Sequence, residues 1–405
     1  MRINILALSF LFPNRVQRGY GVFVLNRLKA LREYCALKVI APIQWYPFID
    51  RLKGAAGGRG VPRRDEIDGI EVFHPRFAVV PRYMKWFDAL SYLWSAARVV
   101  RQLARRNDFT FDLVDVHWTY PDIVAGYVLA RSRSKKFIVT IRGHEALYDQ
   151  EVSLRRWVVA ALLRRADFVI ALSEELRAKV IRLGVSPERC RVVLNGVDLN
   201  SFSYMDREVC RRKLGLSPTS RILISVGRLT QQKGHHELIS VMPQLSQQGE
   251  TQLYIVGGVN REEDFSLVLR KMIADLKLDN VQIVDRVPHD ELASWYGAAD
   301  LFCLATKTEG CPNVVLEALA CGTPVVATNV GAIRELITDD ENGIVVESNR
   351  MSELGDIIGA ALTRRWDREQ IAARMRARSW ASCAEQLLQI YRMILEPAPG
   401  SHTDK

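Results

Sequence analysis

The sequence lacks the features that organise small secreted domains or structural zinc sites. Its seven cysteines are scattered along 405 residues, with no C-x-x-C pair and no histidine-rich partner stretch. This pattern argues against a disulfide framework and against a structural zinc ion. It favours a reducing, cytoplasmic setting.

Long hydrophobic runs are also missing. No stretch of about 18 uncharged apolar residues occurs, so we expect no membrane-spanning helix. The amino-terminal apolar run has no small-x-small cleavage site and ends at Pro13-Asn14. We therefore interpret residues 3–10 as a buried first strand and not as part of a signal peptide.

The positive charge is concentrated in the first half of the chain. Residues 1–199 contain 33 Lys and Arg against 19 Asp and Glu, whereas the remainder contains 23 against 27. A solvated basic surface is one interpretation, and a phospholipid surface or a phosphate-bearing acceptor is the other. No helix-turn-helix, zinc-finger or RNA-binding signature is present, so we expect no nucleic-acid partner.

Short apolar runs alternate with helical segments along the whole chain. A first series of predicted strands covers 3–10, 37–42, 69–73, 112–117, 137–141, 167–173 and 191–196, and a second covers 221–227, 251–258, 281–287, 300–305 and 323–328. This alternation predicts two α/β domains with parallel sheets, at 1–199 and 200–379. Residues 47–68, rich in Gly, Arg and Pro, are predicted to form a mobile loop.

Two carboxylates flank a predicted helix start after the strand at 300–305. Glu309 precedes Pro312, which suits a first helical turn, and Glu317 lies one turn into the helix. The amino end of a helix after a parallel strand binds phosphate, and carboxylates beside it suit ribose and sugar hydroxyls. Taken singly, each glutamate also fits an ordinary surface position.

A second stretch places two cations at the end of the strand 221–227. Arg228 and Lys233 follow Gly227 in the loop that leads to the next helix. Ligands of this architecture bind at the carboxyl ends of parallel strands, where two cations can neutralise a diphosphate. An ordinary basic loop is the alternative.

Together these stretches resemble the retaining glycosyltransferases of family 4, of the cell-envelope and exopolysaccharide type. The resemblance rests on G-R-x4-K-G at 227–234, E-G-x-P-N-x3-E at 309–317, A-C-G-T-P-V-V-A-T at 320–328 and Glu335. LSEELR at 172–177 and NGVDLNSF at 195–202 add to it. It implies the GT-B fold: two Rossmann-like, doubly wound parallel-sheet domains facing a cleft. It also implies that a last helix, 380–396, packs back on the first domain.

The resemblance assigns roles to individual residues. Arg228, Lys233 and Glu309 would be catalytic, the two cations on the donor diphosphate and the glutamate on hydroxyls of the transferred sugar. Glu317 would hold the ribose, and Val287 would lie along the base. The full set of implied donor-binding residues is Gly21, Gly227, Arg228, Lys233, Val287, Glu309, Gly310, Asn313, Val314, Val315 and Glu317.

The first domain matches the family less well. Gly19 and Gly21 follow the first strand, where the family places small residues near the donor phosphates. Many members have a histidine at the third position of T-x-H-G, where this chain has Arg142, with His144 two residues later. Arg142 and His144 are candidates for a cleft position. His117 is a third candidate, and a structural histidine is the alternative for it.

The implied activity is retaining, metal-independent transfer of a hexosyl group from a nucleotide-diphosphate sugar to a glycan or lipid-linked acceptor in polysaccharide or cell-envelope biosynthesis. The resemblance implies no cofactor and no metal, with Arg228, Lys233 and the helix dipole in place of a cation. The sequence agrees, because no D-x-D pair lies in a convincing site. A peripheral position on the inner face of the cell membrane fits residues 82–106, which mix Trp and Tyr with Arg and Lys; a helix packed on the sheet is the alternative. A nucleotide-sugar epimerase and a non-catalytic sugar-nucleotide-binding subunit remain alternative functions.

Overall fold

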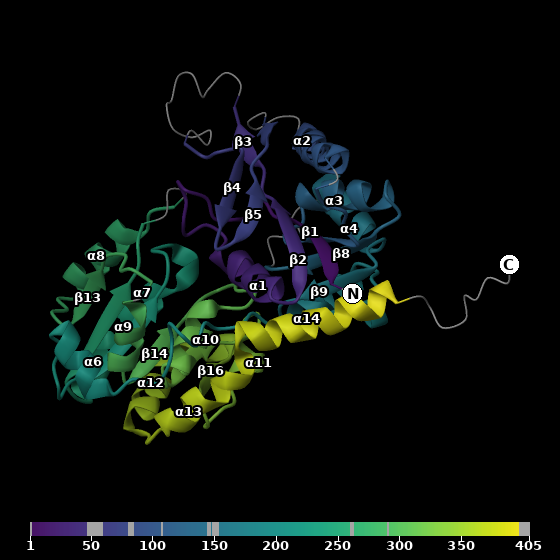
Figure 1. Ribbon diagram of the computed structural model, residues 1–405. Coiled ribbons are helices and arrows are strands. Elements are labelled where there is room, and N and C mark those ends of the chain that lie inside the picture. Colours follow the sequence, from purple (N-terminus) through teal and green to yellow (C-terminus); the bar gives the residue numbers. More distant parts are fainter. Residues whose placement is uncertain are drawn as a thin grey trace. The chain divides into compact units, whose positions relative to one another are not determined.

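The computed structural model describes residues 2–46, 60–79, 85–106, 108–143, 147, 154–259, 263–289 and 291–396. The chain forms two compact units (Figure 1). Unit 1 comprises Met1–Asn195 with Trp380–Lys405, and unit 2 comprises Gly196–Ser379. The division thus falls a few residues before the boundary at 199 that the sequence predicted.

Unit 1 is built on one large sheet with the strand order β10-β9-β8-β7-β1-β2-β5-β4. Its strands are β1 (Ile3–Leu8), β2 (Cys35–Ile40), β4 (Arg64–Ile67), β5 (Ile70–Phe73), β7 (Leu113–Val116), β8 (Lys136–Ile141), β9 (Phe168–Ala171) and β10 (Cys190–Val192). All pairs are parallel except β4 with β5. A separate parallel pair is formed by β3 (Ile43–Trp45) and β6 (Arg76–Ala78).

The segment 47–68 is only partly the loop that its composition predicted. Its last residues form β4, an antiparallel edge strand paired with β5. On this strand Asp65 is buried, and Arg15 pairs with it at 2.8 Å. The local sequence does not predict this strand, because the burial of Asp65 depends on Arg15, which is distant in the sequence. Residues 47–59 lie outside the described part of the chain.

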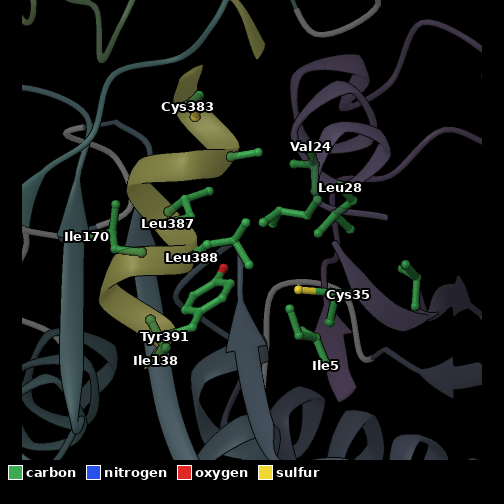
Figure 2. Close-up of a cluster of buried hydrophobic side chains, with 14 of the residues drawn as sticks. Ile5, Val24, Leu28, Cys35, Ile138, Ile170, Cys383, Leu387, Leu388 and Tyr391 are labelled. Atoms are coloured by element: carbon green, nitrogen blue, oxygen red, sulfur yellow. The ribbon is translucent and has the colours of Figure 1, made fainter. Parts of the chain in front are cut away.

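Helices cover both faces of the unit 1 sheet. They are α1 (Val22–Arg32), α2 (Lys85–Arg105), α3 (Asp122–Arg131), α4 (Leu154–Leu163), α5 (Glu174–Arg182) and α14 (Trp380–Leu395). On one face α14 packs beside α1, where Leu387 and Leu388 join the cluster that contains Ile138 (Figure 2). Phe137, next to Ile138, contacts α3 near Gly126. Because neighbouring strand residues point to opposite faces, α3 covers the other face.

Unit 2 is a second parallel sheet, with the order β13-β12-β11-β14-β15-β16. Its strands are β11 (Arg221–Val226), β12 (Thr251–Val256), β13 (Val281–Val284), β14 (Leu301–Leu304), β15 (Val325–Thr328) and β16 (Gly343–Val346). Its helices are α6 (Arg207–Leu214), α7 (His235–Gln247), α8 (Ser266–Asp275), α9 (Leu292–Ala298), α10 (Asn313–Ala320), α11 (Ile333–Leu336), α12 (Leu354–Thr363) and α13 (Arg368–Arg374).

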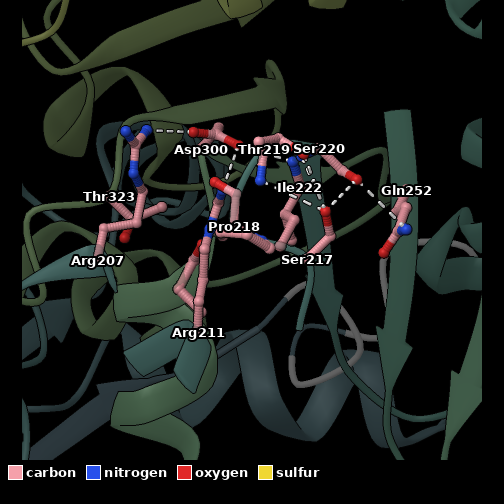
Figure 3. A network of polar contacts seen from close by, with 12 residues as sticks. Arg207, Arg211, Ser217, Pro218, Thr219, Ser220, Ile222, Gln252, Asp300 and Thr323 are labelled. Carbon is pink, nitrogen blue, oxygen red and sulfur yellow. Dashed lines mark hydrogen bonds and ion pairs between the residues drawn. The ribbon is translucent and has the colours of Figure 1, made fainter. Parts of the chain in front are cut away.

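The amino edge of the unit 2 sheet is closed by a polar network around Asp300 (Figure 3). The Asp300 carboxylate accepts a hydrogen bond from the Ile222 backbone at 2.7 Å and pairs with Arg211 at 2.6 Å. Arg207 pairs with its other oxygen. These contacts tie the starts of β11 and β14 together. Because the two strands are parallel, the loops that follow them both lie at the opposite, carboxyl edge. Ligands of parallel sheets bind at that edge.

Candidate functional site

Three loops meet closely at the carboxyl edge of the unit 2 sheet because glycines leave room for them. A side chain at Gly257 would overlap the carbonyl oxygen of Gly227. Gly234 has a φ of +68°, and a side chain there would overlap the carbonyl of Ala305. The loops after β11, β12 and β14 therefore touch through bare backbone, which glycine alone allows.

Lys233 and Glu309 form an ion pair across two of these loops. Lys233 ends a short 3-10 helix, Gln231–Lys233, after β11, and Glu309 lies in the loop after β14. Their side chains are 19% and 12% exposed. The Gln232 carbonyl accepts hydrogen bonds from the Lys307 backbone at 2.9 Å and from the Thr306 hydroxyl at 3.1 Å. The two predicted residues thus meet on a tightly tied pair of loops.

Arg228 starts the same loop as Lys233 but is exposed. Its neighbour Leu229 donates a backbone hydrogen bond to Gly258 at 3.1 Å, which anchors the loop at this point. Within the described residues the Arg228 guanidinium has neither an ion pair nor a hydrogen bond. The exposed side chain of Arg228 reaches solvent at the carboxyl edge of the sheet.

A buried histidine packs against the start of this loop, and the sequence analysis did not select it. His235 is fully buried, and its Nδ1 lies 3.1 Å from the hydroxyl of Ser225. A Cβ atom added at Gly227 would lie 3.7 Å from its Nε2, so the ring is close to this glycine. Burial lowers the pKa of His235 to about 4, so the imidazole is neutral at pH 7. Its position directly after Gly234 was the available sequence signal.

The amino end of α10 points its first amides toward the loop that carries Glu309. Pro312 precedes the helix, and Val315 donates to the Pro312 carbonyl at 3.1 Å. Asn313 and Val314 are half-buried, and Val315 is buried. The first amides of a helix have no acceptors within it, and the helix dipole is positive there. The helix dipole thus makes the end at Asn313 and Val314 attractive to anions, whereas the amide of Val315 is paired with Pro312.

The loop before α10 is braced from behind. Gly331 has a φ of +58°, and a side chain there would overlap the carbonyls of Glu309 and Gly310. Ala332 donates a backbone hydrogen bond to Gly310 at 2.9 Å. Gly310 is buried, so this part of the predicted site shapes the backbone rather than offering a side chain.

Glu317 is held in place by two residues that sequence reasoning missed. The Tyr296 hydroxyl donates to its Oε2 at 2.9 Å, and His289 Nε2 lies 3.7 Å from its Oε1. Tyr296 is fully buried, and burial together with the Glu317 carboxylate raises its pKa well above the usual value. Tyr296 therefore stays a hydroxyl donor, and it fixes the orientation of the carboxylate.

The loop expected to line the base follows β13 at the same edge. Asp285 and Arg286 are exposed, and Val287 is half-buried. The Cβ of Arg286 faces Gly258. The structure thus places Val287 on the carboxyl edge of the unit 2 sheet, directly after the exposed Asp285 and Arg286.

In unit 1, Gly21 caps α1 with a φ of +71°. A side chain at Gly21 would overlap the carbonyl of Leu11, so the turn after β1 folds tightly onto itself. Gly19 lies in the exposed part of that turn. Gly21 therefore has a structural reason to be glycine, independent of any ligand.

His117 and Arg142 are brought together inside unit 1. Arg142 Nη2 lies 2.8 Å from His117 Nδ1, and its Nη1 donates to Asn195 at 3.4 Å. On the other side His117 Nε2 faces Asp115 at 3.3 Å, and Tyr391 of α14 donates to Asp115 at 2.6 Å. All except Asn195 and Arg142 are essentially inaccessible, and those two are nearly so. His144 lies outside the described residues.

This chain of polar groups is partly charged. Burial lowers the pKa of His117, and it lowers that of Arg142 well below the usual value. Burial alone would raise the pKa of Asp115, but His117, Tyr391 and Arg27 together lower it. A neutral imidazole between a carboxylate and a guanidinium follows.

No helix in the described part of the chain has the length and hydropathy needed to cross a bilayer.

Comparisons with known proteins agree across both units. Residues 206–378 match the model described as glycosyl transferases group 1, and residues 54–201 match that of glycosyltransferase family 4. A D-inositol 3-phosphate glycosyltransferase of Frankia alni is 30% identical over 77% of this chain and 76% of that protein. A putative teichuronic acid biosynthesis glycosyltransferase of Bacillus subtilis is 26% identical over 91% and 90%.

The solved structures support the fold. The Anabaena protein HepE in complex with UDP and glucose has a TM-score of 0.71, with 21% identity over 97% of this chain and all of that one. Two Rossmann-like units with parallel sheets are the GT-B fold that the sequence predicted. The chain belongs to glycosyltransferase family 4 and is a glycosyltransferase.

Proposed function

We propose that this glycosyltransferase transfers a hexosyl group, with retention of anomeric configuration, from a nucleoside diphosphate sugar. The observation that carries the proposal is the Lys233–Glu309 pair, set between the exposed cation of Arg228 and the amino end of α10. Cations and helix amides suit a diphosphate, and carboxylates suit hydroxyls. All of these groups lie on one edge of one sheet.

In this proposal the protein itself supplies the charge that stabilises the leaving diphosphate. Lys233 and Arg228 contact phosphate oxygens, and the α10 dipole adds positive potential without reorganisation. Transfer then requires no divalent metal. Glu309, released from part of its pairing with Lys233, accepts hydrogen bonds from the sugar. Glu317, oriented by Tyr296, accepts them from the ribose.

We further propose a glycan or lipid-linked acceptor, in polysaccharide or cell-envelope biosynthesis, with the enzyme cytoplasmic and peripheral on the inner membrane face. The name of the Bacillus subtilis relative, which refers to teichuronic acid biosynthesis, supports this acceptor class. The net charge of +14 over residues 1–199 supports a negatively charged surface or acceptor near unit 1.

The test uses a panel of nucleoside diphosphate hexoses with membrane and glycan extracts as acceptors. Purified product is examined by NMR for its anomeric configuration. Lys233→Met and Glu309→Gln should each lower transfer by about 100-fold or more, as removal of one preorganised charge does in other enzymes. Lys271→Met, at an exposed position on α8, is the matched control.

Three outcomes would contradict the proposal. Normal transfer by both site variants would remove the assigned donor site. An inverted product would exclude retention. An epimerised donor without a transferred sugar would favour the epimerase alternative.

A further inference from the structure

Large apolar side chains stand in solvent on two helices of unit 1. On α2, Trp86, Leu90 and Trp94 follow one another at four-residue spacing and are 50%, 51% and 58% exposed. On α4, Leu154 is 64% exposed and Trp157 is 70% exposed. Scattered exposed leucines are ordinary, but three tryptophans at this exposure on two helices indicate an interaction surface.

The core of unit 1 does not need these side chains. The opposite side of α2 is buried through Tyr92, Ala96 and Val100, which pack the helix on its neighbours. The packed-helix interpretation of residues 82–106 thus holds for one side of α2 only. The other side of α2 carries Trp86 and Trp94, which are at least half exposed in the described part of the chain.

The exposed apolar groups of α2 and α4 lie toward the same end of unit 1. The helices α2, α3 and α4 form one layer, with α3 in contact with both others (Figure 1). In a parallel sheet each connecting helix starts at the carboxyl edge and returns to the amino edge. The helix α4 connects β8 to β9, so Leu154 and Trp157 in its first turn lie at the carboxyl edge of the sheet. The helix α2 ends before β7 begins, so Trp86 in its first turn lies at the end away from the amino edge.

The exposed charged side chains of these three helices are all basic. The three helices contain two acidic residues, Asp88 and Asp122, and both are buried. Arg98, Arg101 and Arg105 are exposed along α2, in continuation of the tryptophan stripe. Arg98 lies 4.9 Å from the ring centroid of Trp94. The outward surface therefore presents aromatic and basic groups and no carboxylates of its own helices.

We propose that this α2–α4 surface, formed by Trp86, Leu90, Trp94, Leu154 and Trp157 with the arginines of α2, docks unit 1 on an anionic phospholipid bilayer. Tryptophan is stable at the boundary between headgroups and acyl chains, and arginine beside it pairs with lipid phosphate. The exposed arginines of α2 are complementary to anionic lipid and not to a neutral one. The proposal rests on the proposed membrane-side function and gives it a location.

The test measures co-sedimentation of the full chain with phosphatidylglycerol-rich vesicles and with pure phosphatidylcholine vesicles, without donor or acceptor. We expect binding to the anionic vesicles only. Trp94→Ser/Trp157→Ser should weaken it by about tenfold or more, because each substitution removes apolar area that the bilayer would bury. Leu267→Ser/Val268→Ser is the matched control, since these neighbouring side chains of α8 are 74% and 43% exposed in unit 2.

A second variant separates charge from apolar insertion. Arg98→Gln/Arg101→Gln/Arg105→Gln should lower binding at low salt and flatten its salt dependence, because screening acts on the charges alone. Unchanged vesicle binding by the tryptophan variant would overturn the proposal. A second contradicting result would be a dimer of the parent chain in size-exclusion chromatography together with a monomer of the tryptophan variant. A second copy of the chain would then cover the surface.

The donor site provides an independent measurement. Binding of nucleoside diphosphate to the same variants is followed by calorimetry. Weakened vesicle binding with intact nucleotide binding supports the surface. Normal vesicle binding by a protein that transfers no sugar counts against the proposed function and leaves the surface standing.

Discussion

Arg142 Nη2 lies 2.8 Å from His117 Nδ1, and this contact determines which ring nitrogen of the histidine holds the proton. A guanidinium only donates, so Nδ1 must accept. The neutral imidazole then has its proton on Nε2, which faces the Asp115 carboxylate at 3.3 Å. Arg142 is thus held by His117, the residue after β7, and His117 in turn faces Asp115 of β7.

Tyr391 connects this chain of groups to α14, so we predict that Tyr391→Phe destabilises unit 1. The substitution keeps the ring and removes only the hydroxyl that donates to Asp115 at 2.6 Å. A buried acceptor that loses its donor costs about 1–3 kcal/mol. Denaturant unfolding measures the change in the free energy of unfolding, and hydrogen exchange of unit 1 amides assigns the change to this unit.

Tyr34→Phe is the control for this substitution, because Tyr34 is 43% exposed and removal of its hydroxyl leaves no buried group without a partner. Equal stability of the two variants would show that the Tyr391–Asp115 contact does not stabilise the fold.

His235 predicts a pH dependence of stability in unit 2. Its pKa is about 4 when folded and 6.5 in the reference state, so the unfolded chain binds the extra proton first. Stability must therefore fall as pH decreases from about 6.5 toward 4, by about 3 kcal/mol at the lower end. Denaturant unfolding at several pH values gives the slope of the unfolding free energy against pH. Hydrogen exchange of unit 2 amides assigns that slope to this unit.

The variant His235→Asn isolates this contribution. Its absolute stability will be lower, but its slope between pH 6.5 and 4 should be shallower than that of the parent chain. A slope equal to the parent's would mean that other groups cause the dependence. Asp122 acts in the opposite direction in unit 1, because burial raises its pKa to about 7.

The sequence predicted most of the parallel strands because each is a short, mainly apolar run between loops. The strands that it missed are short, and several are charged. In β4 the residues Arg64, Asp65 and Glu66 resemble a loop, and only the distant partner Arg15 makes the burial of Asp65 acceptable. In β16 a run of four residues follows the acidic loop Asp339-Asp340 and was too short to stand out.

The same division applies to the candidate site. Lys233, Glu309 and Glu317 could be selected because each belongs to a local motif with fixed spacing. Tyr296 and Tyr391 could not, because each meets its carboxylate only in the folded chain. Tyr391 lies 276 residues after Asp115, and no local pattern joins them.

We predict that transferase activity survives an excess of EDTA. In the proposed site the diphosphate meets Lys233, Arg228 and the amino end of α10, so its charge is neutralised without a divalent ion. Initial rates are measured before and after chelation with the donor identified by the panel. A complete loss of activity that magnesium or manganese restores would show that a metal is required.

The last prediction concerns Glu317, whose carboxylate is oriented by Tyr296. Glu317→Gln should weaken binding of a nucleoside diphosphate by about tenfold or more, because hydrogen bonds from ribose hydroxyls to a charged acceptor are lost. Its binding of the 2′,3′-dideoxy analogue should equal that of the parent chain, because that analogue has no hydroxyls to donate. Tyr296→Phe should reduce the discrimination less, since it frees the carboxylate to rotate without removing it. If Glu317→Gln lowers the stability of unit 2 yet still prefers the ribose form as strongly as the parent does, Glu317 is a structural partner of Tyr296 and not a ligand of the donor.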